Sequence, residues 1–95
     1  MVYESPLTVE EVARLAKLRG MLRSGEAERI RKRAGIMRSE AAGACGVRES
    51  TVWRWETGRK PPLTRRALAY LRLLELLTEA IAEKRSSTSG PGWPD

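Results

Sequence analysis

Apolar residues recur along this chain at helical spacing in several stretches, which are separated by glycines and prolines. The first stretch begins after Pro6, where Thr8-Val9-Glu10-Glu11 has the form of a helix-capping box. Its apolar residues lie three or four positions apart, at Val12, Leu15, Leu18 and Leu22, and this spacing predicts a helix over about 8–23. No stretch of useful length alternates apolar and polar residues as a strand would, so we predict an all-α fold.

Three short helices and one long helix are predicted after this one, over about 26–34, 38–45, 49–57 and 64–84. Gly35, Gly46 and Gly58 follow the short helices, where glycine allows the chain to reverse without the steric cost of a Cβ atom. Residues 85–95 are rich in Ser, Gly and Pro, a composition typical of disorder. The pattern therefore divides the chain into an N-terminal helical extension (1–23), a compact helical domain (24–84) and a disordered tail (85–95).

The amino-acid composition restricts which kinds of binding site and catalytic site this chain can form. The 95 residues include 18 Lys and Arg against 12 Asp and Glu, and the net charge of +6 favours a polyanionic partner, either nucleic acid or an anionic surface. The chain has no His and a single cysteine, Cys45, so we expect no Cys/His zinc site, no His-based triad and no disulfide. No cofactor and no metal are expected, and no cluster of titratable residues indicates an enzyme.

The same residues predict a soluble protein of the cytoplasm. A lone cysteine fits a reducing compartment, and the acidic start MVYESPLTVEE is unlike a signal peptide. The longest apolar stretch, around Leu68–Leu77, is interrupted by Arg72 and Glu75. We therefore expect no membrane span, which needs about 20 apolar residues.

Residues 38–57 are expected to form two short helices joined by a tight turn at Cys45-Gly46-Val47-Arg48. Small residues in the first helix (Ala41, Ala42 and Ala44) allow a close approach of the second. In the second helix Val52 and Trp55 are three positions apart and share one face, whereas Ser50, Trp53 and Arg54 lie elsewhere on it. This arrangement suits a helix-turn-helix, whose second helix enters the DNA major groove.

Residues 24–77 resemble the Cro/C1-type (XRE-like) helix-turn-helix domain of phage and bacterial repressors. The matching features are Ile30-Arg31 with Gly35 four residues beyond the Arg, Ala42, Gly46-Val47, Ser50-Thr51-Val52, and Arg54-Trp55-Glu56-x-Gly58 followed by Pro61. The resemblance implies a lambda-repressor-like helical bundle, to which the helix over 8–23 and the long last helix are additions. It also implies double-stranded DNA as the partner and no small-molecule ligand.

The resemblance further implies a role for individual residues. The base-reading positions would be Glu49, Ser50, Trp53 and Arg54. Arg54 has the geometry to bind guanine and Glu49 to accept a hydrogen bond from cytosine. Arg31 and Glu56 would pair across the domain as a structural ion pair, and the core would hold Ile30, Ala42, Val47, Val52 and Trp55.

Four further basic residues flank the second helix and are expected to contact DNA phosphates: Arg38, Arg48, Arg59 and Lys60. For each of these charges, and for Arg54, the alternative is an ordinary solvated side chain. For Glu49 the alternative is a favourable interaction with the helix dipole alone, and Ser50 could simply satisfy the helix end.

The long last helix carries two apolar stripes. One consists of Ala67, Leu71, Leu74, Thr78 and Ile81, and the other of Tyr70, Leu73, Leu77 and Ala80. The second stripe would either cover the N-terminal helix or form a homodimer. We favour the homodimer, because two recognition helices about 34 Å apart would meet successive major grooves.

The sequence thus favours a small, sequence-specific DNA-binding transcriptional regulator, a Cro-like or phage-type repressor that acts by occupying an operator on the nucleoid. The alternative is an antitoxin-like or other protein-interaction module with secondary DNA binding. In that case the apolar stripe, or the tail with Trp93, would hold the partner. RNA is disfavoured because its major groove is too deep and narrow for a reading helix.

Overall fold

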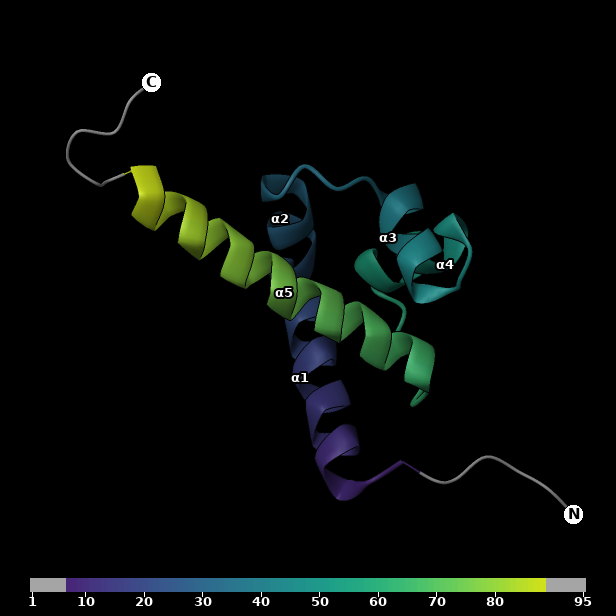
Figure 1. The fold of residues 1–95 in the computed structure, drawn as a ribbon. Helices are drawn as coiled ribbons and strands as arrows, with labels where there is room; N and C mark the ends of the chain where they lie inside the picture. The colour runs from purple at the N-terminus through teal and green to yellow at the C-terminus, as the bar shows by residue number, and fades with distance from the viewer. Residues whose placement is uncertain (1–6, 89–95) are drawn as a thin grey trace, which may run out of the picture.

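The computed structural model describes residues 7–88 of the chain, and this part consists of five helices without a strand (Figure 1). The predicted all-α class is therefore confirmed. The helices are α1 (Val9–Ser24), α2 (Glu26–Arg33), α3 (Arg38–Cys45), α4 (Glu49–Glu56) and α5 (Arg65–Thr88). Long α5 crosses α1 and α2, and its C-terminal end extends beyond α2 (Figure 1).

Each predicted helix is found, with most ends within one residue of the expected position. The exception is α5, which continues to Thr88 rather than ending at Lys84. The predicted disordered tail is therefore wrong over 85–88. The physical reason is that the first helix-breaking residue after Pro62 is Gly90, and Ser and Thr alone do not stop a helix. The remainder of the predicted tail, 89–95 with Trp93, lies outside the described residues.

The capping box predicted at the start of α1 is present. The N–H of Glu11 donates to the Thr8 hydroxyl (3.1 Å), and the N–H of Thr8 donates to the Glu11 carboxylate (2.9 Å). At the other end a single residue, Gly25, separates α1 from α2 in a left-handed conformation (φ 83°). This geometry lets the chain change direction between two helices within one residue.

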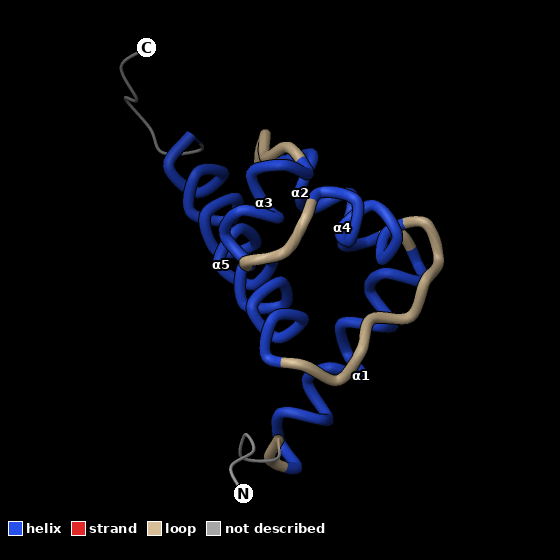
Figure 2. Tube along the Cα trace, turned by 90° about the vertical axis from the view of Figure 1, so that its right-hand side faces the viewer, coloured by secondary structure: helices blue, strands red, loops and turns tan. Residues whose placement is uncertain are grey.

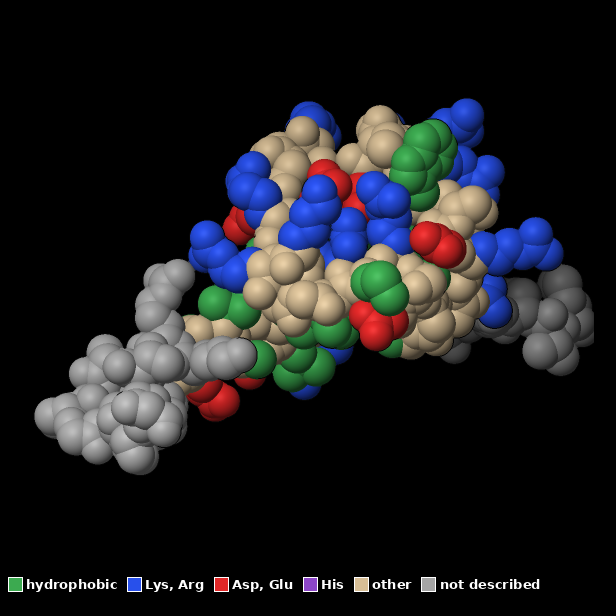
Figure 3. All heavy atoms as spheres, turned by 90° about the horizontal axis from the view of Figure 1, so that it is seen from above, with side chains coloured by type: hydrophobic (Ala, Val, Ile, Leu, Met, Phe, Trp, Pro, Cys, Tyr) green, Lys and Arg blue, Asp and Glu red, His purple; other side chains and the backbone are tan. Residues whose placement is uncertain are grey.

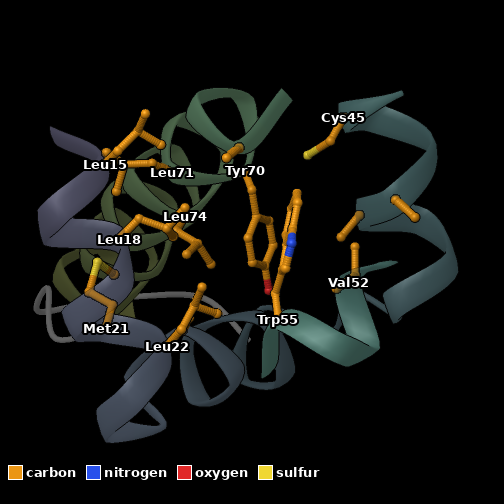
Figure 4. Close-up of a cluster of buried hydrophobic side chains, with 14 residues drawn as sticks. Leu15, Leu18, Met21, Leu22, Cys45, Val52, Trp55, Tyr70, Leu71 and Leu74 are labelled. Carbon is orange, nitrogen blue, oxygen red and sulfur yellow. The ribbon is translucent and has the colours of Figure 1, made fainter. Parts of the chain in front are cut away.

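All five helices contribute to one core. Figure 4 shows Leu15 and Leu18 of α1 beside Leu71 and Leu74 of α5, on one side of a central Trp55. Val52, Ala42 and Trp55 are buried as predicted, whereas Ile30 and Val47 are half-buried against the core. The Trp55 and Tyr70 rings pack with centroids 5.9 Å apart.

Tyr70 corrects the prediction of an exposed stripe on α5. It was expected on the outer stripe with Leu73, Leu77 and Ala80, but it is fully buried. Position 70 shares the inward face of α5 with buried Ala67 and Leu74, and its hydroxyl bonds to α4. Leu73 and Leu77 are half-buried and Ala80 is exposed. A homodimer face on α5 therefore cannot include Tyr70.

The described residues lack two features, a membrane-spanning helix and a metal-binding cluster. None of the helices in this part of the chain is both long and apolar enough to cross a membrane. Among the same residues, no group of three or more Cys, Asp or Glu side chains is arranged to hold a metal ion.

Candidate nucleic-acid interface

Helices α3 and α4 are joined by the three residues Gly46–Arg48. Gly46 adopts a left-handed conformation (φ 74°), and the N–H of Val47 donates to the Ala42 carbonyl (3.0 Å), which closes the end of α3. Ala42 is only 2% exposed and Val52 is fully buried. The small residues of α3 thus allow α4 to pack closely, and the turn fixes the direction in which α4 points.

The outer face of α4 is polar, with one exposed tryptophan. Glu49, Ser50, Trp53 and Arg54 are all exposed, while Val52 and Trp55 on the opposite face are buried. Half of the Trp53 surface is open to solvent. The four residues proposed as base readers from sequence therefore lie together on one accessible face of one helix.

Positive charge surrounds this helix. Residues 29–72 contain twelve Arg and Lys against three Glu, and Lys and Arg side chains gather across the face seen in Figure 3. Arg48, Arg59 and Lys60 flank α4 and are exposed. In the part of the chain that is described, none of these three, nor Arg54, forms an ion pair, so their charge is available to a partner.

Beneath this surface Arg31 and Glu56 form a bidentate ion pair between α2 and α4. The Arg31 Nε and Nη2 atoms lie 2.7 and 2.9 Å from the two Glu56 carboxylate oxygens, and Nη1 donates to the Ile36 carbonyl (2.8 Å). The two side chains are 5% and 1% exposed. A buried pair of this geometry fixes the position of α4 on the domain.

Two further donors complete the Glu56 site. The Tyr70 hydroxyl donates to Oε2 (2.5 Å) and the Arg38 Nε donates to Oε1 (3.1 Å). Burial by itself raises the pKa of Glu56, but the hydrogen bonds from Arg31, Tyr70 and Arg38 outweigh it and hold that pKa below its ordinary value. Burial, together with the bond to Glu56, raises the pKa of Tyr70.

Arg38 has a structural partner that the sequence did not indicate. It was expected to contact phosphate from the start of α3, but it is half-buried, and its guanidinium faces Glu56 and, at 3.9 Å, Glu28. Tyr70 was likewise missed as a member of this network. Both contacts join residues at least 10 positions apart, for which helical periodicity carries no signal.

The geometry of α3 and α4 defines a helix-turn-helix, with two short packed helices, a three-residue turn and an exposed polar face on the second helix. Residues 24–83 match a family model described as "Helix-turn-helix domain", and the chain belongs to this family. It is accordingly a DNA-binding helix-turn-helix protein. No match was found among curated proteins or among solved structures.

Proposed function

We propose that this protein is a sequence-specific transcriptional regulator of double-stranded DNA, specifically a small Cro-like (XRE-type) repressor. The observation that carries the proposal is the outer face of α4, where four exposed residues are flanked by exposed arginines and a lysine that form no ion pair with the described residues. A helix with this surface, held rigidly by its neighbours, fits the major groove of about 12 Å.

Base reading is assigned to Glu49, Ser50, Trp53 and Arg54. Arg54 would bind the O6 and N7 atoms of a guanine, and Glu49 would accept from a cytosine amino group. Trp53 would cover a thymine methyl group or a sugar, which removes an exposed apolar surface from water. These contacts supply selectivity, whereas the phosphate contacts supply most of the affinity.

Phosphate contacts are assigned to Arg48, Arg59 and Lys60, with a secondary contribution from Arg38, whose side chain is 31% exposed. Bound at a promoter on the nucleoid, the protein would act by occupancy and exclude polymerase. This mechanism requires no catalysis, cofactor or small-molecule ligand.

A homodimer through α5 completes the proposal. Leu73, Leu76, Leu77 and Ala80 occupy one stripe at positions i, i+3, i+4 and i+7, and Leu76 is 44% exposed. A second copy is the favoured occupant, because one helix-turn-helix buries little DNA and a two-fold pair reads two half-sites. An unlike protein partner on the same stripe would instead favour an antitoxin-like role.

Two substitutions, one on the outer face of α4 and one in the segment that follows it, test the assigned roles. Arg54→Ala should cost about 1–3 kcal/mol of binding free energy and relax preference at one base pair. Arg59→Ala should weaken binding to all duplexes alike and flatten the salt dependence by about one unit of slope. Arg72→Ala, an exposed arginine on α5, is the control for loss of charge. Fluorescence anisotropy on a preferred duplex and on single-base variants would measure all three.

Unchanged binding and base preference in Arg54→Ala would contradict the reading role of α4. A loss in Arg59→Ala confined to one sequence would contradict its role as a phosphate contact.

A further inference from the structure

A surface hollow of about 350 Å³ lies beside the end of α4, between the last turns of α1 and the segment that leads to α5. Arg19 and Arg23 of α1 line one side, and Arg59 and Lys60 of the connecting segment line the other. The family match begins at residue 24. The α1 side of this hollow is therefore an addition to the helix-turn-helix domain that the match covers.

Arg19 fixes the connecting segment against α1. Its Nε and Nη2 atoms both donate to the Pro61 carbonyl, at 3.1 and 2.7 Å. Figure 2 shows the loop after α4 running along α1. One guanidinium thus uses two donors to join positions 42 residues apart, and it holds Arg59 and Lys60 at a defined place beside α1.

The hollow presents positive charge that the protein itself does not neutralise. Arg23, Arg59 and Lys60 are exposed, and within residues 7–83 none of them has an ion-pair partner. Glu56 also lines the hollow, but its side chain is only 1% exposed and its oxygens already accept from Arg31, Arg38 and Tyr70. An anion that enters the hollow therefore meets cations on two sides and little opposing charge.

We infer that this hollow binds a backbone phosphate of the DNA, and that Arg23 is a phosphate contact which α1 adds to those of the helix-turn-helix. The inference rests on the proposed DNA-binding function. It assigns Arg19 as a positioning residue that holds the loop, and Arg59 and Lys60 as the opposite wall of the same site. Because α1 and α4 both end here, the competing explanation is that these cations only balance two helix dipoles.

The test compares Arg23→Gln with Arg72→Gln, which removes the same charge from a different hollow, on the N-terminal half of α5. Binding of the full chain to its selected duplex and to a scrambled duplex is measured by anisotropy between about 50 and 200 mM salt. For Arg23→Gln we expect the slope of log K against log salt to decrease by about one on both duplexes. The preference for the selected duplex should be unchanged, and Arg72→Gln should keep the wild-type slope.

Three results would overturn the inference. A wild-type slope in Arg23→Gln, with only a lower melting temperature, would leave the dipole explanation and the DNA-binding function standing. Equal flattening by Arg23→Gln and Arg72→Gln would show a general charge effect rather than a site. Absence of any preference in the wild-type protein would remove the proposed function, and the inference with it.

Discussion

At the scale of single residues, Glu56 determines how α4 is held. Its buried carboxylate accepts hydrogen bonds from Arg31, Arg38 and Tyr70, which come from three other helices. The proposed recognition surface and the Glu56 carboxylate belong to the same short helix, with Arg54 exposed only two positions from Glu56. Substitutions of Glu56 are therefore expected to lower the stability of the fold, and to weaken DNA binding as a consequence of that loss.

Removing either Arg31 or Glu56 from their buried ion pair should destabilise the fold by more than the loss of buried surface area alone would predict. Arg31→Met should cost about 3–5 kcal/mol, because the buried Glu56 carboxylate loses its bidentate partner and keeps only single hydrogen bonds from Arg38 and Tyr70. Glu56→Leu should cost more, since Arg31 then keeps only its bond to the Ile36 carbonyl and the Tyr70 hydroxyl loses its buried acceptor. The double variant should be more stable than the sum of the two losses predicts. Urea denaturation of the three variants measures these costs, and additive losses would contradict the coupling.

The lowered pKa of Glu56 also predicts an effect of pH on stability. The Glu56 carboxylate is protonated near pH 4.5 in the unfolded chain and only at a lower pH in the folded protein. The ionised Glu56 therefore contributes to the free energy of unfolding above about pH 4.5. This contribution to stability is lost as the pH falls from about 4.5 through the lower pKa that Glu56 has in the folded protein. Thermal melting between about pH 6 and pH 3 should show the decline.

In Glu56→Gln this decline should be markedly shallower. Glu11→Gln is the control, because the pKa of that partly exposed carboxylate is also lowered, chiefly by the backbone N–H of Thr8. Identical melting profiles for Glu56→Gln and Glu11→Gln across this range would count against a dominant role of Glu56 in acid stability.

At the scale of helices, periodicity and breakers were sufficient to predict each element. Glycines at 35, 46 and 58 all have positive φ and follow α2, α3 and α4 as expected. The buried face of α5 was harder to predict, because Tyr70 is amphipathic and its side chain alone does not indicate which face of the helix is buried. Only the packed structure shows that its hydroxyl has a buried acceptor on α4. The role of Arg19 could also not be predicted from the sequence, because its hydrogen-bond partner is a backbone carbonyl 42 residues away.

The exposed stripe of α5 gives a prediction about assembly. Leu76→Lys should shift the protein from dimer to monomer in sedimentation experiments, because a charge replaces an apolar side chain in the proposed interface. Val9→Lys, at an exposed apolar position on α1, is the matched control and should leave the dimer intact. A wild-type monomer at micromolar concentration, or an unchanged dimer in Leu76→Lys, would remove the homodimer from the proposal.

At the scale of the whole molecule, the fold combines a helix-turn-helix with two flanking helices that support it. α1 contributes Leu15, Leu18, Met21 and Leu22 to the core, so it belongs to the packed structure of the protein rather than only preceding it. The basic middle of the chain carries the proposed DNA-binding surface, and α5 carries the proposed dimer surface. The proposed base reading, phosphate binding and dimer formation are thus carried out by different parts of one small helical bundle.

The central proposal, that α4 reads DNA sequence, is tested most directly by selecting bound sites from random duplex DNA at two salt concentrations. We expect an enriched two-fold motif with half-sites about 10 base pairs apart, retained at the higher salt. An enriched single half-site would keep sequence reading and remove the homodimer. Binding without any enriched sequence, which weakens simply as salt rises, would show charge attraction alone and contradict the proposed function.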